Sequence, residues 1–221
     1  MTDDPFGTRY EDLPATLPVF PLTGVLLLPR GKLPLNIFEP RYLAMTRDAL
    51  GAGRLIGMIQ PRLADDPAEV PALYEIGCAG RITQFAETDD GRYLITLTGV
   101  CRFAITEEVA SMRGYRRAQV DWSRFRQDLD EPTGVSLDRE GLVERLQRYF
   151  DGRGIQADWN SIRSTSDERL VTTLAMVCPF EPGEKQGLLE CPSLEDRSAL
   201  LMALIEMAAA GGDKGDDHVR H

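Results

Sequence analysis

The chain changes character within Asn36-Ile37-Phe38-Glu39-Pro40-Arg41-Tyr42, a stretch that sets a carboxylate, a guanidinium and two aromatic rings around one proline. Pro40 suits the first position of a helix, where its missing N–H costs nothing. Glu39 precedes it, where a carboxylate meets the positive end of the helix dipole. Behind the proline, apolar side chains fall near one face and Gly51 supplies a stop; the apolar set is Tyr42, Leu43, Met45, Ala49 and Leu50. The stretch predicts a capped helix clamped onto a barrel.

The sequence around this helix predicts strands. From Leu17 to about Val120, short apolar runs are broken by Gly and Pro, which is typical of strands in a small sheet or barrel. Asp89-Asp90-Gly91 separates two of these runs, and an Asp-Gly pair supplies the positive φ angles of a tight hairpin turn. The expected strands are Leu17–Phe20, Val25–Leu28, Leu55–Ile59, Ile76–Ile82 and Tyr93–Leu97.

The second half of the chain has helical spacing. Between Leu142 and Phe150 the apolar residues recur at i, i+1, i+4, i+7 and i+8, which forms one stripe along a helix. Thr165-Ser166-Asp167-Glu168 fits a capping box ahead of the next helix. Glu181-Pro182 opens a short helix, and Ser193-Leu194-Glu195-Asp196 is a variant box ahead of the last one. We therefore expect a helical bundle.

A polar and acidic segment, Gln127 to Gly134, separates the two halves, and its composition is typical of a linker. The expected organisation is a flexible N-terminus at 1–14, a β-rich domain at 15–122, a linker at 123–136, a helical bundle at 137–211 and a disordered tail at 212–221. The predicted fold class is α+β.

The charge balance argues against nucleic acid as the main partner. The formal net charge is -10, whereas phosphate binding relies on Lys and Arg. The stretch Arg113–Arg126 is an exception, because its arginines alternate with aromatic residues. It is either an anion or nucleic-acid face, or a strand whose arginines pair with the surplus acid of the chain. The overall charge favours the second interpretation.

Targeting and redox signals indicate a cytoplasmic protein. The N-terminus, Met1 to Pro5, is polar and acidic, unlike a secretory signal. The apolar runs are far shorter than a membrane span. The four cysteines form no C-x-x-C pair, so we expect buried, reduced thiols.

Catalytic patterns are missing. The histidines, His218 and His221, lie in the tail, so no positioned imidazole is available for a Ser-His-Asp or Cys-His site or for most zinc sites. The sequence contains no P-loop pattern. Lys185 and Ser193 could form a Ser–Lys dyad, but Ser193 reads better as a helix cap. We expect no catalytic residue, no metal and no cofactor.

A series of motifs runs through both halves in order. They are Leu17–Leu22, Pro29, Leu33–Leu35, Ile37–Tyr42, Gly77–Ile82, Gly99–Phe103, Leu174–Phe180 and Glu184–Glu190. Together these motifs resemble the Lon N-terminal domain, the substrate-binding region of ATP-dependent Lon proteases. The resemblance covers roughly residues 15–210. It implies a stand-alone member without the ATPase and protease modules, because their P-loop and Ser–Lys dyad are missing.

The resemblance implies a PUA-like β pseudo-barrel with one inserted helix, followed by a helical bundle. It also implies a non-catalytic module that binds peptides or unfolded protein, through a strand edge or an apolar groove. Candidate contact residues, chosen by motif position and chemistry, are Phe38, Arg41, Tyr42, Arg81, Arg102 and Phe103. Alternatively, the two phenylalanines belong to the core and the arginines form structural pairs. The second candidate function is RNA binding, since the PUA-like superfamily includes RNA-binding members.

Overall fold

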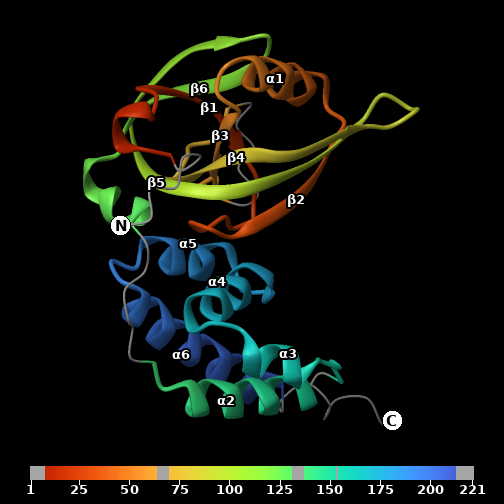
Figure 1. Ribbon diagram of the computed structural model, residues 1–221, viewed down its shortest axis with the longest axis vertical. Helices are drawn as coiled ribbons and strands as arrows, with labels where there is room; N and C mark the ends of the chain where they lie inside the picture. Colours follow the sequence, from red (N-terminus) through yellow and green to blue (C-terminus); the bar gives the residue numbers. More distant parts are fainter. Residues whose placement is uncertain (1–7, 64–69, 131–136, 153, 213–221) are drawn as a thin grey trace, which may run out of the picture. The chain divides into compact units, whose positions relative to one another are not determined.

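The computed structural model describes residues 8–63, 70–130, 137–152 and 154–212. Residues 1–7 of the expected flexible N-terminus and 213–221 of the expected tail lie outside the described residues. The rest of the N-terminal segment is ordered against expectation, because Tyr10–Asp12 forms the 3-10 helix η1 and the Pro14 carbonyl accepts from Trp122 Nε1 at 2.9 Å. The chain divides into two units, Met1–Glu131 and Pro132–His221. The first unit holds the strands together with one α-helix, and the described part of the second unit is helical (Figure 1), so the structure has the expected α+β class.

The first unit is built on a six-stranded sheet with the order β2-β5-β4-β3-β1-β6. Strands β1 and β3 are parallel, and the other neighbours are antiparallel. The strands are β1 (Thr16–Pro21), β2 (Lys32–Ile37), β3 (Leu55–Ile59), β4 (Ile76–Glu87), β5 (Tyr93–Met112) and β6 (Tyr115–Asp121).

The sheet curls because β5 is long enough to serve two sets of neighbours. Its first part pairs with β2 and β4, and its last part pairs with β6, which in turn pairs with β1. Within the described residues β2 pairs only with β5, so the sheet keeps an edge and is not a closed barrel. Lys32 and Pro34 lie on this edge strand, and a charge and a proline both discourage the addition of another strand.

One predicted strand is wrong. Val25–Leu28 has no regular secondary structure and belongs to no sheet. Its Leu26, Leu27 and Leu28 are nevertheless buried. The segment lies against Gly99 of β5, where an added Cβ would stand only 1.9 Å from the Leu28 carbonyl oxygen. The apolar run therefore reflects burial of a connecting segment, which has the same local pattern as a buried strand.

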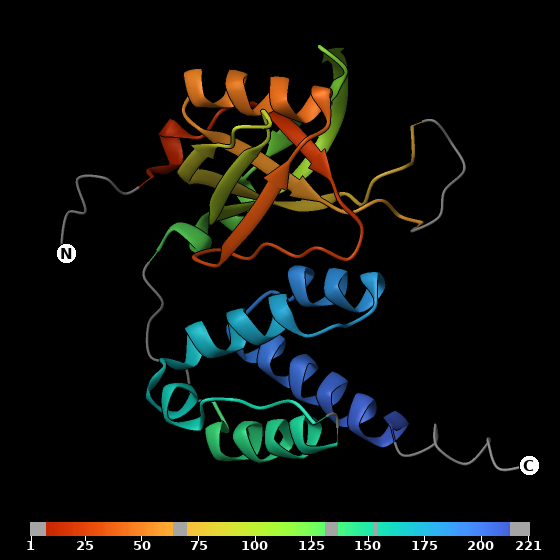
Figure 2. The same ribbon diagram turned by 90° about the vertical axis from the view of Figure 1, so that its right-hand side faces the viewer.

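The predicted helix and hairpin are confirmed. Helix α1 spans Pro40–Gly51 with Pro40 in its first turn, and it packs on β1, β3 and β6 (Figure 2). Glu39 occupies the N-cap position, but its side chain makes no capping bond. In the β4–β5 hairpin, Gly91 has φ +80°, the conformation that the Asp-Gly pair predicts.

Part of the expected linker is folded. Ser123–Leu129 forms the 3-10 helix η2, in which Phe125 and Asp128 are buried. Asp128 accepts hydrogen bonds from Arg102 Nε at 2.9 Å and Nη2 at 2.8 Å, and Arg102 lies 2% exposed. The Arg102 guanidinium also lies over the Phe125 ring, 4.6 Å from its centroid. This buried ion pair fastens η2 to β5.

The second unit contains five described helices, and the longest of them, α6, contacts three of the others. The helices are α2 (Arg139–Asp151), α3 (Trp159–Ser164), α4 (Asp167–Val177), α5 (Pro182–Glu190) and α6 (Leu194–Gly212). Helix α6 contacts α2, α4 and α5, and the predicted stripe of α2 is buried at Leu142, Leu146 and Tyr149.

The capping predictions have mixed outcomes. Ser193 Oγ accepts from the Asp196 N–H at 3.0 Å, as predicted for the start of α6. Helix α5 carries a capping box between Glu181 and Glu184. The box predicted ahead of α4 does not form, because the N-cap residue Ser166 makes no side-chain capping bond.

Two buried cations lock successive helices together. Lys185 Nζ donates to the Met176 carbonyl at 3.2 Å, in the last turn of α4. Arg197 Nε donates to the Leu188 carbonyl at 2.9 Å, near the end of α5. Cations are favoured at helix C-termini, where the carbonyls lack intrahelical partners. Burial lowers the pKa of Lys185. The Glu184–Glu190 motif thus has a structural role.

The four cysteines, all within the described residues, are buried, and no disulfide joins them. Burial raises the pKa of Cys101 to about 12, from an ordinary value of 9.0, and the nearby Asp128 carboxylate adds to the shift. The folded protein therefore holds this thiol in its neutral form, which is a poor nucleophile.

We expect Cys101→Ala to reduce the loss of stability at alkaline pH. A group whose folded pKa is raised stabilises fully below its unfolded pKa, and that contribution is lost as pH rises toward the folded pKa. For Cys101 the window runs from 9.0 to about 12. Between pH 8 and 10 the wild type should lose about 1.4 kcal/mol more than the variant. Urea unfolding at both pH values measures this, and parallel losses would contradict it.

Candidate functional site

Three of the predicted contact residues gather where α1 begins. Phe38 is 63% exposed in the connection between β2 and α1. Arg41 lies over the Tyr42 ring, 4.6 Å from its centroid. Tyr42 is buried and stacks on Phe20 of β1, with ring centroids 4.1 Å apart. The start of α1 is therefore anchored by Tyr42 and presents Phe38 and Arg41 to solvent.

Two adjoining cavities flank Arg41 and Tyr42. One, of about 210 Å³, is bounded by the ends of β1 and β2 and by Phe38 and Glu39. The other, of about 530 Å³, is bounded by the end of β1, the Pro61 and Pro71 segments and the β5–β6 hairpin. Both cavities share Pro21, Arg41 and Tyr42. We call the two together the α1 groove.

The hairpin wall of the α1 groove depends on a tight turn. Arg113 and Gly114 connect β5 to β6 with φ +51° and +84°, which suits a two-residue hairpin turn. An added Cβ on Gly114 would come within 3.4 Å of Arg41 Cβ. Asp48 of α1 accepts from Arg113 Nη1 and the Tyr115 hydroxyl, both at 2.9 Å, and so ties the hairpin to the helix.

Two ion pairs line the α1 groove. Arg41 bonds to Glu39 Oε2 through Nε at 2.9 Å and Nη2 at 2.8 Å. Arg116 holds Glu108 through two nitrogens, one of them Nε at 2.9 Å. Its Nη1 donates to the Pro71 carbonyl at 2.7 Å. Both guanidiniums are therefore already paired with a carboxylate of the same chain.

Tyr42 lies within the electrostatic field of Arg41, Glu39 and Arg116. Burial raises the pKa of its hydroxyl, the Arg41 and Arg116 guanidiniums oppose that shift, and Glu39 adds to it. Val70, which lines the larger cavity, is 64% exposed. The α1 groove thus combines exposed apolar side chains at Phe38 and Val70 with internally balanced charges.

The sequence matches the ATP-dependent protease La (LON) substrate-binding domain over residues 16–207. The chain belongs to this family. Lon protease 2 of Myxococcus xanthus is 32% identical over 201 residues, covering 88% of this chain and 24% of that protein. The Lon protease of Anaeromyxobacter dehalogenans is 26% identical over 205 residues, with 91% and 24% covered. The chain therefore spans about a quarter of the length of these Lon proteases.

Solved Lon structures share the fold. The crystal structure of the Lon N-terminal domain protein from Xanthomonas campestris has a TM-score of 0.60 at 26% identity, covering 85% of this chain and 97% of that one. The N-terminal domain of Mycobacterium avium complex Lon protease has a TM-score of 0.59 at 17% identity, with 92% and 100% covered, which shows the fold alone. In the part of this Lon domain that the structure describes, no helix is long and apolar enough to cross a membrane.

The other predicted contact residues of this Lon domain lie elsewhere. Phe103 is fully buried and packs edge-on against Trp122. Arg102 is held by Asp128 beneath η2. Arg81 donates to the Gly53 carbonyl and to a threonine hydroxyl, both at 2.9 Å. Arg102 and Phe103 thus lie in the interior, out of reach of a peptide at the surface, as the core alternative anticipates.

Three residues of the α1 groove were not predicted from the sequence. Val70, Glu108 and Arg116 come from separate segments, and only the fold brings them to Arg41. Arg116 belongs to the basic stretch, in which three of the five arginines pair with acids, in line with the interpretation of structural pairing. Arg113 bonds to Asp48, Arg116 to Glu108 and Arg124 to Glu75. The sequence carries no signal for which acid meets which arginine.

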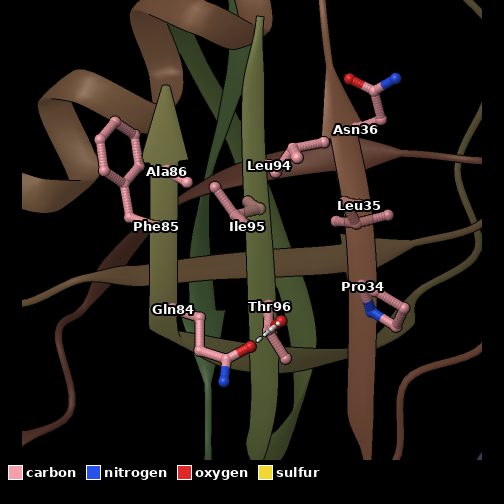
Figure 3. Close-up of a pocket in the computed structure, with 9 residues that line it drawn as sticks. All are labelled: Pro34, Leu35, Asn36, Gln84, Phe85, Ala86, Leu94, Ile95 and Thr96. Atoms are coloured by element: carbon pink, nitrogen blue, oxygen red, sulfur yellow. Dashed lines mark hydrogen bonds between the residues drawn. The ribbon is translucent and has the colours of Figure 1, made fainter. Parts of the chain in front are cut away.

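A second, more open surface covers the outer face of β2, β5 and β4 (Figure 3). Leu94 is 47% exposed there, between Ala86 of β4 and Asn36 of β2. The hydroxyl of Thr96 donates to Gln84 Oε1 at 2.8 Å across the strands. This sheet face is a rival to the α1 groove and can be tested separately.

The Ser–Lys pair considered from the sequence is divided between two structural roles. Ser193 Oγ donates to Asp196 Oδ2 at 2.6 Å, within the α6 cap. Lys185 Nζ is directed to the Met176 carbonyl. Each side chain stabilises a helix end.

Proposed function

We propose that this Lon domain binds extended or unfolded polypeptide in the α1 groove without cleaving it. The observation that carries the proposal is the pair of exposed apolar side chains, Phe38 and Val70, on the two adjoining cavities that share Tyr42. Exposed apolar surface around a cleft is typical of a binding site. Membership of the substrate-binding family supports protein as the ligand.

Groove binding fits the site better than strand addition. Strand addition requires an open sheet edge, and the β2 edge carries Lys32 and Pro34. In the α1 groove, by contrast, apolar side chains of a bound segment could replace water around Phe38 and Val70. Ordering a flexible chain costs about 2–5 kcal/mol, so we expect dissociation constants on the order of micromolar.

We expect Phe38→Ser and Val70→Ser to weaken binding of fluorescein-labelled casein. Burying a side chain of this kind contributes about 1.5–3 kcal/mol, so each variant should lose at least about tenfold in affinity. Fluorescence anisotropy measures the affinity, and gel electrophoresis of the same samples should show intact casein.

Leu94→Ser is the matched control, because Leu94 is also exposed and apolar but lies on the outer sheet face. It should bind casein like the wild type. A loss confined to Leu94→Ser would move the site to that sheet face. Progressive fragmentation of casein would contradict the non-catalytic part of the proposal.

A further inference from the structure

We infer that Glu39 and Glu108 determine the charge specificity of the α1 groove, by holding Arg41 and Arg116 away from the charges of a bound segment. The inference rests on the proposed function, since it concerns what the same groove accepts. It predicts a groove that tolerates acidic, basic and uncharged flanking residues equally. It also predicts that removing the two carboxylates turns the groove into a site for acidic segments.

The charged lining of the α1 groove, among the described residues, consists of two arginines and two glutamates. Each arginine is paired with one of those glutamates, at Arg41–Glu39 and Arg116–Glu108. The formal charges of this lining therefore cancel within the groove.

The two ion pairs should affect the charge specificity of the groove to different degrees. The side chains of Arg41 and Glu39 are 50% and 43% exposed, so water and salt screen that pair. The Arg116 side chain is only 16% exposed and is bound in bidentate fashion by Glu108. A guanidinium with so little access to water interacts more strongly with a nearby charge. Glu108 should therefore contribute more to specificity than Glu39.

An arginine that is already paired adds little to the affinity for a carboxylate on the ligand. A ligand carboxylate that bonds to the same guanidinium nitrogens must displace Glu39 or Glu108, so that one ion pair is exchanged for another. A ligand ammonium must likewise compete with Arg41 or Arg116 for the glutamate. Electrostatic complementarity selects partners when charges on the site are unmatched, and here the site supplies its own counter-charges.

Removing the carboxylate while keeping the shape changes this balance. Glu→Gln leaves a side chain of the same size that accepts hydrogen bonds but has no charge. The freed guanidinium can then form a charge-assisted bond with a ligand carboxylate. Arg116 keeps its bond to the Pro71 carbonyl, so it should stay at the groove when Glu108 is replaced.

The test uses three labelled peptides with the same apolar centre, flanked by Asp, Lys or Ser. Their affinities for the full chain are measured by fluorescence anisotropy at low salt and in high salt, for the wild type, Glu39→Gln, Glu108→Gln and the double variant. The matched control is Glu75→Gln, which frees Arg124 from an exposed pair outside the groove. Circular dichroism checks that every variant is folded.

We expect the wild type and the Glu75→Gln control to bind the three peptides within about threefold of one another. The double variant should prefer the Asp-flanked over the Ser-flanked peptide by roughly tenfold at low salt, and high salt should remove most of that preference. Of the two single variants, Glu108→Gln should show the larger part of this preference for the Asp-flanked peptide. If Glu108→Gln fails to fold, Glu39→Gln at the exposed pair still shows whether loss of a carboxylate shifts the preference toward the Asp-flanked peptide.

A strong preference of the wild type for Asp- or Lys-flanked peptides would overturn the inference and leave the proposed function standing. So would unchanged preferences in folded Glu→Gln variants, or an equal gain in the Glu75→Gln control. Failure of the wild type to bind any of the peptides and casein would overturn the proposed function itself, and the inference with it.

Discussion

Asp128→Ala is expected to cost the first unit about 3–5 kcal/mol, because it removes the carboxylate that neutralises a buried guanidinium. Arg102 is 2% exposed, and Asp128 accepts from its backbone N–H at 3.0 Å as well as from its side chain. Loss of the carboxylate should also detach η2, since Arg30 bonds to the Asp128 carbonyl at 2.7 Å and depends on the same placement.

Urea unfolding followed by tryptophan fluorescence measures this loss. The chain has two tryptophans, Trp122 and Trp159, so a Trp159→Phe background makes the signal specific to the first unit. The double variant Arg102→Met with Asp128→Leu should recover most of the stability, because apolar replacement of a buried pair is often neutral. A loss below about 1 kcal/mol for Asp128→Ala would place it among surface pairs and refute the prediction.

Gly99→Ala is expected to destabilise the same unit by about 3 kcal/mol, the upper end of the usual cost of overpacking. The added methyl group would stand 1.9 Å from the Leu28 carbonyl oxygen and 2.7 Å from its carbonyl carbon. These are backbone atoms, so no side-chain rotation can relieve the clash. The connection is further fixed by two bonds, from Arg30 N to Gly99 O and from Gly99 N to Gly31 O, both 2.8 Å.

Gly51→Ala is the matched control for this substitution. Gly51 lies at the end of α1, and an added Cβ there would meet nothing within 4 Å. Alanine has the better helix propensity, so this variant should be neutral or more stable by up to about 1 kcal/mol. The same fluorescence measurement compares the two. Equal stability of Gly99→Ala and Gly51→Ala would mean that the 25–28 segment shifts at little cost to accommodate the methyl group, and would contradict the prediction.

Local sequence patterns predicted most of the secondary structure. The Pro40 start of α1, the Gly91 turn and the stripe of α2 depend on neighbours within a few residues. Helix α3 was not predicted, although Asp158 caps it by accepting from Asn160 N at 3.0 Å. Its short length leaves little periodic signal, and periodicity is the main evidence that a single sequence offers.

The candidate site was predicted only in part. Phe38, Arg41 and Tyr42 lie together because they fall within five residues of one motif. Arg102 and Phe103 come from another motif, but their side chains turn inward, where η2 supplies Asp128 and Trp122 covers the phenylalanine ring. Chemistry and motif position alone do not distinguish a binding arginine from a buried one, since that depends on which acid the fold brings near.

The sequence by itself determined the family, the α+β class, the start of α1 and the β4–β5 hairpin, because these follow from motifs and short-range geometry. The tertiary structure decided that Val25–Leu28 is a buried connection and that β5 joins two sets of strands. It also decided that Glu108 and Arg116 complete a groove with Arg41. These features depend on contacts between residues far apart in the chain, and such contacts exist only once the sheet has curled and brought the segments together.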